Sequence, residues 1–279
     1  MDPSAGKSMG GGSRLPSWIV SLKSPKPYGG MLYMVGTSHV SKVSQMRVRQ
    51  AINMIKPGLV MLELCKKRKN MLKAGTPKSC CSLCRNLTQV ALSGHMGLAV
   101  FGYLLSKLMQ RAAEEVGVHP GEDLKVAADE ARRHRASLIL GDRDFLVTVR
   151  RMWCSLTPYE QMCLCAELYY TTYVSSRWSS LTDSKYFNKW LGKRYPSLVK
   201  PLITERDAYM AHVLRYFVDQ GKTVVAVVGE AHVQGICEQW EKETDVQKLL
   251  HVPSNSQIGA IRLVCALVIV LCLFYLFTY

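Results

Sequence analysis

The sequence predicts an α/β fold in which a sheet is surrounded by helices. Short apolar runs, typical of buried strands, alternate with longer segments typical of helices. Two of the apolar runs, residues 31–35 and 224–228, lead into the same pattern, Gly-x-x-His. Hydrophobic residues make up 48% of the 279 positions, which is ample for a core. These observations favour a single large α/β domain.

The first half of that domain follows a leader that we expect to be flexible. Residues 1–30 are rich in Gly and Pro and lack the apolar core of a signal peptide. Pro57-Gly58 ends the first expected helix, and Pro120-Gly121 opens another whose first turn is acidic, as the helix dipole prefers. The expected elements are a strand over 31–35, a helix over 44–56, a strand over 59–64, a helical pair within 87–116 and a helix over 122–135.

The second half begins with a short apolar run before Gly141. Residues 136–140 predict a third strand, and residues 145–216 predict a mainly helical region interrupted at its prolines. Residues 223–228 are rich in valine and predict the fourth strand. Residues 244–257 are expected to be a linker.

Each predicted strand is followed by a polar or ionisable side chain. His39, Glu63, Asp142 and His232 stand at or just after the ends of the four runs. Open α/β sheets bind ligands at the carboxyl ends of their strands, so side chains far apart in sequence can meet there. The doubled Gly-x-x-His pattern therefore predicts one shared site.

Imidazoles and carboxylates are a suitable ligand set for a divalent metal ion. Neutral imidazole suits zinc, manganese, cobalt or iron, and a carboxylate balances the charge of the ion. Hydrolysis is the natural reaction class for such a site. The alternative is that these groups only hold loops together. The carboxylates would then form structural ion pairs with Arg68, Arg143 or Arg206.

The chain is strongly basic, with a formal net charge of +15. A nucleic-acid partner would explain this charge, but no zinc finger, aromatic RNA-binding motif or homeodomain-like helix accompanies it. We therefore expect no nucleic acid. A solvated basic face, near anionic lipid, is the simpler interpretation.

The carboxyl terminus is an uncharged apolar run. Residues from Leu263 to Tyr279 carry no charge, and Arg262 stands near one end, where it could reach the interface. Residues 258–279 are therefore expected to be a transmembrane tail anchor that contacts membrane lipid, with the bulk of the protein facing the cytosol.

The strand-end motifs occur in an order that resembles the TraB family, which includes bacterial pheromone-shutdown proteins and, more distantly, the Tiki metalloproteases. The motifs are Gly36-Thr37-Ser38-His39-Val40-Ser41, Glu63-Leu64-Cys65-x-x-Arg68, Leu140-Gly141-Asp142-Arg143, Thr148-x-x-Arg151-x-Trp153, Glu205-Arg206-Asp207-x-x-Met210 and Val228-Gly229-x-x-His232-x-x-Gly235-Ile236. The resemblance implies a TraB-like α/β domain over residues 31–243.

The resemblance also implies roles for individual residues. His39, His232 and Glu63 would hold a divalent metal ion, Mn, Co or Zn, and Glu63 and Asp123 would be the catalytic carboxylates. Asp123 stands where the family usually has a glutamate. The implied activity is that of a metal-dependent hydrolase of the peptidase type. The arginines that would pair with carboxylates or with an anionic substrate group are Arg68, Arg143 and Arg206.

Similar TraB-domain proteins imply a location and an alternative function. The expected location is the mitochondrial outer membrane, facing the cytosol, with the endoplasmic reticulum membrane as the alternative. The alternative function is a non-catalytic adaptor or tether of that outer membrane, which binds protein partners at organelle contacts or in quality control.

Overall fold

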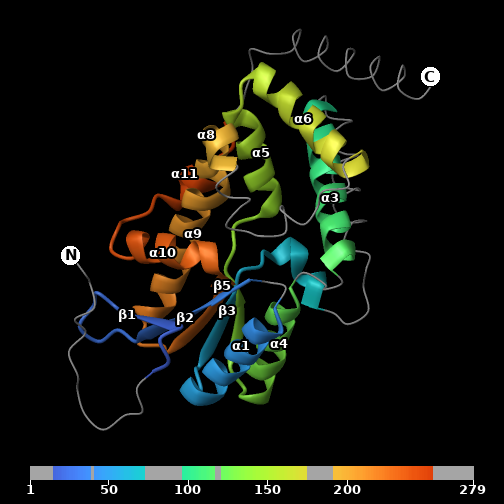
Figure 1. Ribbon diagram of the computed structural model, residues 1–279. Coiled ribbons are helices and arrows are strands. Elements are labelled where there is room, and N and C mark those ends of the chain that lie inside the picture. Colours follow the sequence, from blue (N-terminus) through green and yellow to red (C-terminus); the bar gives the residue numbers. More distant parts are fainter. Residues whose placement is uncertain (1–14, 39–40, 73–95, 117–120, 175–190, 254–279) are drawn as a thin grey trace.

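The computed structural model describes residues 15–38, 41–72, 96–116, 121–174 and 191–253 (Figure 1). One five-stranded sheet forms the centre, with the strand order β1-β2-β5-β3-β4. The strands β2, β5, β3 and β4 are parallel, whereas β1 is antiparallel to β2 at one edge. The strands are β1 (Ile19–Lys23), β2 (Met31–Thr37), β3 (Leu59–Leu62), β4 (Ser137–Leu140) and β5 (Val224–Gly229). The predicted α/β sheet is thereby confirmed.

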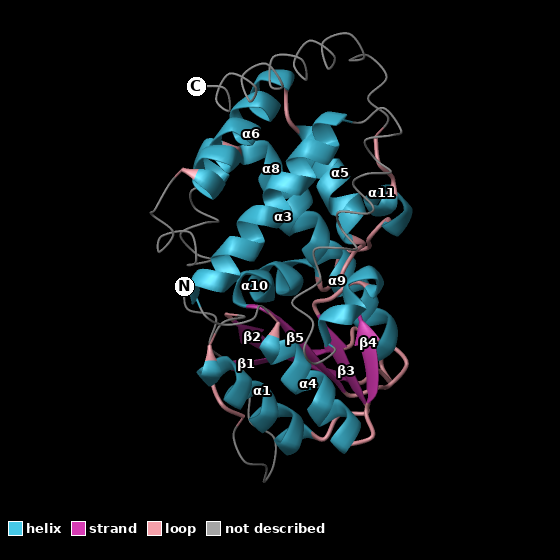
Figure 2. Cartoon of the chain, turned by 90° about the vertical axis from the view of Figure 1, so that its right-hand side faces the viewer, coloured by secondary structure: helices cyan, strands magenta, loops and turns pink. Residues whose placement is uncertain are grey.

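Helices cover both faces of this sheet and extend beyond its carboxyl edge (Figure 2). On one face α1 and α4 pack on the strands, and on the other face α9 and α10 do so. The helices α3, α5, α6 and α8 form a further layer with a hydrophobic cluster of its own. The helices are α1 (Lys42–Ile55), η1 (Lys66–Leu72), α3 (Met96–Val116), α4 (Glu122–Arg133), α5 (Phe145–Ser155), α6 (Pro158–Tyr173), α8 (Pro196–Val199), η2 (Lys200–Thr204), α9 (Glu205–Val218), α10 (Glu230–Gln239) and α11 (Val246–Leu250).

Local signals explain where these helices begin. The Ser41 side chain accepts a hydrogen bond from the Val43 amide at the start of α1, and Asp144 does the same for Leu146 in α5. Thr157 and Glu160 form a capping box at the start of α6. The caps of α1 and α5 therefore determine where these helices begin after β2 and β4. This positions the loops at the carboxyl edge of the sheet.

β5 is the central strand and is buried along its whole length. Val224 lies opposite Leu32 of β2 on one side and opposite Leu59 of β3 on the other. A strand that is covered on both faces must be apolar at every position, which is why its sequence lacks polar alternation. This position brings the end of β5 next to the ends of β2 and β3.

One strand lies in the segment that was expected to be a flexible leader. In β1, Ile19 is buried, and from Val20 onward partly buried side chains alternate with exposed ones, as in an edge strand. Its pairing partner is β2, with Ile19 opposite Val35. The prolines and glycines around it therefore mark turns on either side of a short edge strand.

The predicted fold class needs one correction, which concerns the transmembrane helix. Among the helices that the structure describes, none is both long enough and apolar enough to cross a membrane. The 21-residue α3 is long enough, but charged residues interrupt its sequence, for example Lys107 and Arg111. The expected span over 258–279, with Arg262, Leu263 and Tyr279, lies outside the described residues. The fold class that the described residues show is therefore mixed α/β, and a transmembrane helix is not part of it.

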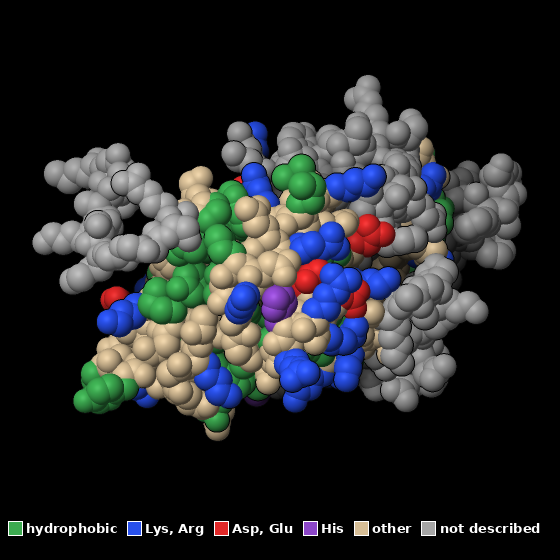
Figure 3. All heavy atoms as spheres, turned by 90° about the horizontal axis from the view of Figure 1, so that it is seen from below, with side chains coloured by type: hydrophobic (Ala, Val, Ile, Leu, Met, Phe, Trp, Pro, Cys, Tyr) green, Lys and Arg blue, Asp and Glu red, His purple; other side chains and the backbone are tan. Residues whose placement is uncertain are grey.

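The basic residues of the chain are unevenly distributed over the surface. Figure 3 looks at the end of the molecule where the parallel strands begin, and Lys and Arg side chains gather on it. This end is opposite the carboxyl edge of the sheet.

Candidate functional site

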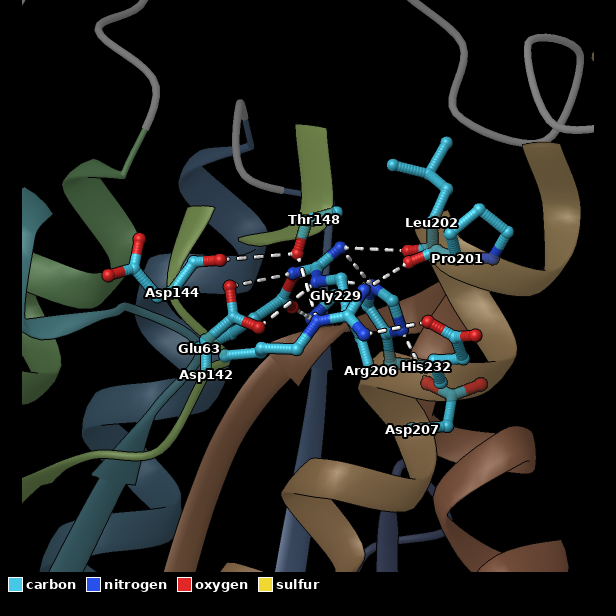
Figure 4. A network of polar contacts seen from close by, with 12 residues as sticks. Glu63, Asp142, Asp144, Thr148, Pro201, Leu202, Arg206, Asp207, Gly229 and His232 are labelled. Carbon is cyan, nitrogen blue, oxygen red and sulfur yellow. Dashed lines mark hydrogen bonds and ion pairs between the residues drawn. The ribbon is translucent and has the colours of Figure 1, made fainter. Parts of the chain in front are cut away.

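Charged side chains from separate strand ends meet at the carboxyl edge of the sheet (Figure 4). Glu63 follows β3, Asp142 follows β4, and His232 lies in the first turn of α10 after β5. All three are buried, with 6–8% of their surface exposed. The structure thus brings Glu63 and His232 together, with 3.2 Å between Oε1 and Nε2. His39, the other predicted imidazole, lies outside the described residues.

Arg206, in the first turn of α9, lies between these groups. Its guanidinium donates to both carboxylate oxygens of Asp142, from Nε to Oδ1 and from Nη2 to Oδ2, at 3.0 Å each. Nη2 also donates to Oε1 of Glu63. Although burial would favour its neutral form, the negative charges of Asp142 and Glu63 raise the pKa of Arg206. The arginine is thus a permanent cation between two carboxylates.

His232 is held at one ring nitrogen by a buried carboxylate. Its Nδ1 lies 2.5 Å from Oδ1 of Asp207, so Nδ1–H donates to Asp207. Its Nε2 lies 3.2 Å from Oε1 of Glu63 and 3.1 Å from Nη1 of Arg206. The neutral ring can accept from Arg206 at Nε2, whereas the protonated ring donates to Glu63.

The proton on this imidazole is strongly held. Burial would lower the pKa of His232, but the negative charge of Glu63 and the hydrogen bond to Asp207 outweigh it and raise the pKa to about 9. Burial also raises the pKa of Asp207, against the opposing effect of the hydrogen bond with His232. The pair therefore keeps a proton at a pH at which a solvent-exposed histidine has lost it.

Glu63 is fixed by the backbone of the neighbouring strand. The amide of Gly229, the last residue of β5, donates to Oε2 of Glu63 at 2.6 Å. The other oxygen, Oε1, faces Arg206 and His232. The carboxylate is therefore oriented before any ligand arrives.

The turn before α9 places Arg206 and Asp207 on the site. η2 is a single π-helical turn that runs directly into α9, and π turns are frequent at functional sites. The Leu202 carbonyl of η2 accepts from Nη1 of Arg206 at 3.3 Å. Asp207 then follows in the same helical turn and faces His232.

A second charged cluster is joined to the first through consecutive residues. Glu205, next to Arg206, accepts from Arg143 and Arg151 at 2.7 Å each. Although burial favours the neutral carboxyl, hydrogen bonds from Arg151 and Arg143 lower the pKa of Glu205. Arg143, next to Asp142, also donates to the carbonyls of Pro201 and Leu249, at 2.6 and 3.1 Å. The two clusters are therefore joined through the backbone at two points, between Glu205 and Arg206 and between Asp142 and Arg143.

The remaining predicted site residues lie in other surroundings. Arg143 is fully buried and its hydrogen bonds go to the protein itself. Arg68 lies over the ring of Phe145, with 5.6 Å from Cζ to the ring centroid. Asp123 is buried in the first turn of α4, and no hydrogen bond or ion pair between described residues joins it to Arg206 or His232. The structure thus assembles Glu63, His232 and Arg206 from the predicted set.

The described residues supply part of a metal-binding set. Oε1 of Glu63 and Nε2 of His232 are 3.2 Å apart, a separation that two ligands of one ion can have. Asp207 orients the far side of the imidazole, as outer carboxylates do for metal-bound histidines. Within the described part of the chain, however, no group of three or more His, Cys, Asp or Glu residues could hold an ion. The guanidinium of Arg206 contacts both donors, so it would have to turn away from an ion.

Asp207 is the functional residue of this site that the candidate assignments omitted. It belongs to the run Glu205-Arg206-Asp207, in which neighbouring residues alternate in charge. The run Asp142-Arg143-Asp144 alternates in the same way. Two such runs that pair crosswise, Asp142 with Arg206 and Arg143 with Glu205, are a signal that could have located the site.

The sequence of this domain is similar to those of known proteins. The profile of the TraB/PrgY/gumN family matches residues 18–245. A protein from Bos taurus named TraB domain-containing protein is 26% identical over 84% of this chain and 68% of its own length. The protein of the same name from Homo sapiens is 27% identical over 84% and 69%. An uncharacterized protein of the archaeon Methanocaldococcus jannaschii is 27% identical over 86% of this chain and 63% of its own.

Proposed function

Since this chain belongs to the TraB/PrgY/gumN family, we propose that its α/β domain is a hydrolase whose active centre is the cluster of Glu63, Asp207 and His232. The observation that carries this proposal is the alignment of the three side chains. A buried carboxylate holds Nδ1 of the imidazole and directs Nε2 towards a second, fixed carboxylate. Such a chain of positioned acid and base groups is a common arrangement for proton transfer.

Each residue has a role that follows from its contacts. Asp207 holds the imidazole at Nδ1–H, so that Nε2 faces Glu63; Nε2 carries the proton in the metal-free chain and would give it up when an ion binds there. Glu63 is fixed by the Gly229 amide and accepts a proton or a cation at Oε1. Arg206 pairs with the buried carboxylates of Glu63 and Asp142 and could pair with an anionic group of a substrate if it released Glu63.

We propose a divalent metal ion, Mn, Co or Zn, as the cofactor, held by Glu63 and His232 with His39 as a further ligand. The 3.2 Å between the Glu63 and His232 donor atoms and the carboxylate behind the imidazole support this assignment. An ion of this kind would act as a Lewis acid that polarises the carbonyl group of an amide, so that water could hydrolyse its C–N bond. Together with the resemblance to metalloproteases, this makes a peptide the proposed substrate class.

Titration calorimetry of the metal-depleted full-length chain tests the cofactor. MnCl₂, CoCl₂ and ZnCl₂ are titrated separately into the parent chain and into His232→Ala. We expect one of the ions to bind stoichiometrically to the parent, and to bind His232→Ala at least tenfold more weakly, since an outer-shell change alone costs about 10–100-fold. His212→Ala, in α9 outside the site, is the matched control and should bind like the parent.

Hydrolysis is tested by mass spectrometry of a mixed peptide library incubated with the same chains. We expect cleavage products from the parent and from His212→Ala, and none from Glu63→Gln. A folded chain that binds none of the ions and leaves the library intact would overturn the hydrolase proposal.

A non-catalytic adaptor is the second candidate function. The observation in its favour is that Arg206 already forms ion pairs with both Glu63 and Asp142, as it would in a purely structural cluster. On this alternative, Glu63→Gln and His232→Ala would change the stability of the chain, and neither metal binding nor hydrolysis would be found in the parent.

A further inference from the structure

The end of the molecule opposite the candidate site carries a row of basic side chains. Lys56 stands three positions before the first residue of β3, and Lys222 and Arg135 stand two positions before those of β5 and β4. These three strands are adjacent and parallel, and their first residues are in register, with Leu59 opposite both Val224 and Ser137. Because the three strands are adjacent and begin at the same edge, the three basic residues lie at one edge of the sheet, in a row that is not in strict register. All three are exposed.

Two members of this row have a left-handed backbone conformation, which is energetically unfavourable for residues other than glycine. Among the described residues, Lys56 and Arg135 are the non-glycine residues with positive φ, at 48° and 54°. Arg135 lies after α4, where the Ala136 amide donates to the Ala131 carbonyl and the Arg135 amide to the Arg132 carbonyl. That pattern usually has glycine at the left-handed position. A non-glycine residue in this strained conformation is reason to look for a function of its side chain.

The helix dipole does not explain why a basic residue occupies position 135. A cation at the end of a helix is favourable, but Arg132 and Arg133 already lie in the last turn of α4. These two arginines also have acidic partners on the same helix, Asp129 and Glu130. Arg135 is therefore an additional positive charge at this end.

The row has no neutralising partners of its own. Within the described part of the chain, no ion pair joins Lys56, Arg135 or Lys222 to an acidic residue. Figure 3 shows how Lys and Arg side chains dominate the charged groups on this face. A concentration of unpaired cations at one end attracts a polyanion.

An exposed tyrosine borders the same edge. The Tyr28 side chain is 94% exposed, and its carbonyl lies 3.4 Å from the position of an added Cβ on Gly221, the residue before Lys222. Lys26 lies in the same turn, with 66% of its side chain exposed, and forms an ion pair with Asp219 at 3.4 Å. A tyrosine flanked by lysines is typical of a membrane interface. Single-stranded nucleic acids bind instead to grooves with several stacking aromatics.

We propose that this face, the amino-end rim formed by Lys26, Tyr28, Lys56, Arg135 and Lys222, docks on a membrane surface through the phosphates and carboxylates of anionic phospholipids. The rim is at the opposite end of the sheet from Glu63 and His232, so a substrate could reach that site while the rim is bound. This inference does not depend on the proposed hydrolase function.

Vesicle flotation of the full-length chain tests the rim. The vesicles are phosphatidylcholine alone or an equimolar mixture with phosphatidylserine, and the measured quantity is the gain in binding that phosphatidylserine causes. In Lys56→Gly/Arg135→Gly we expect this gain to fall roughly 25-fold, since each basic residue near an anionic surface contributes about a fivefold factor. Its melting temperature should be equal to or higher than that of the parent, because glycine relieves the left-handed strain.

The controls separate charge at the rim from charge in general. Lys42→Gln/Arg150→Gln removes the same charge at exposed positions in α1 and α5 and should keep the full gain. The charge-conserving pair Lys56→Arg/Arg135→Lys should keep it as well. Equal losses in the glycine and glutamine pairs, or no loss in either, would overturn the proposal. So would tighter binding of the parent to duplex DNA than to the mixed vesicles.

Discussion

At the scale of single residues, the positive charge of Arg206 allows two buried carboxylates to lie close together in the site. Glu63 and Asp142 come from the ends of neighbouring strands and would repel each other in a buried space. The guanidinium contacts both of them and leaves Nη1 beside His232. Removing one partner of such a cluster typically costs about 3–5 kcal/mol, because the remaining charges are left buried and unpaired.

The raised pKa of His232 predicts that the protein loses stability as the pH rises. The pKa is about 9 in the folded chain, against a reference value of 6.5. This contribution is therefore complete below about pH 6.5 and is lost as the pH rises through about 9, by about 3 kcal/mol in total. Urea unfolding between about pH 6 and about pH 10 measures it.

The His232→Gln variant is the control for this pH effect. Glutamine keeps polar atoms at the position but does not titrate, so its unfolding free energy should decline less steeply with pH than that of the parent. Parallel pH profiles for the two chains would show that His232 does not carry the raised pKa.

Gly235 is a second residue whose identity the site dictates. It lies in α10, one turn after His232, and an added Cβ would overlap Oδ2 of Asp207 and lie 2.6 Å from its Cγ. Alanine normally stabilises a helix relative to glycine, by about 1 kcal/mol. Here we expect Gly235→Ala to destabilise the protein by about 1–3 kcal/mol, as overpacking does.

Urea unfolding of Gly235→Ala against Gly58→Ala checks this prediction. An added Cβ at Gly58 meets nothing within 4 Å, so that control should differ little from the parent. If Gly235→Ala were as stable as the parent, close packing of α10 against Asp207 would not be the reason for the glycine.

At the scale of elements, residues 244–253 of the expected linker pack on the domain through α11 and the residues after it. Residues 246–253, which we call the C-terminal strap, include α11 and bind to two arginines through backbone carbonyls. Arg143 donates to the Leu249 carbonyl at 3.1 Å, and Arg151 donates to those of Lys248 and His251. Glu205 holds both arginines, so the strap is connected to the helix that carries Arg206.

We therefore predict that Arg151→Met loosens the C-terminal strap. The variant loses the donors to Lys248 and His251 and one of the two partners of Glu205. Hydrogen exchange followed by mass spectrometry should show faster exchange in the peptide that covers residues 246–253.

Arg150→Met provides the matched control for the strap. Arg150 is the preceding residue of α5 and is exposed, so its loss should leave the exchange of the strap as in the parent. Equal exchange rates in the two variants would mean that Arg151 does not fasten the strap.

At the scale of the whole molecule, the hydrophobic interior is divided into parts. Two clusters cover the two faces of the sheet, and a third lies among α3, α5, α6 and α8. Phe101 and Trp153 stack within the third cluster, with ring centroids 5.4 Å apart. The site lies where the helical layer meets the carboxyl ends of the strands (Figure 1).

This division predicts that the helical layer can be weakened while the sheet stays folded. Trp153→Ala removes a large buried ring and should destabilise the layer by about 3–5 kcal/mol. Hydrogen exchange should then accelerate in α3 and α5 more than in β5. Leu62→Ala, in the buried strand β3, is the control and should accelerate exchange in the sheet. Uniform acceleration in both variants would indicate a single cooperative unit.

Much of the fold was predictable because strands and helices are encoded locally. The strands that became β2, β3, β4 and β5 were recognisable as apolar runs before glycines or polar residues, and α1 and α4 by their flanking Pro and Gly. The partnership of Glu63 with His232 followed from the rule that parallel strands end at one edge. β1 was missed because an isolated five-residue strand between prolines has little local signal.

The sequence by itself determined which groups stand at the strand ends, since hydrophobic periodicity and turn residues are properties of short segments. Only the tertiary structure decided that Arg206 lies between Glu63, Asp142 and His232, and that Asp207 holds the imidazole. The physical reason is that an ion pair depends on the distance between two atoms in space. Glu63 and Arg206 are 143 positions apart in the chain, so local sequence patterns do not indicate that they are close. They come into contact only when the helices pack on the sheet.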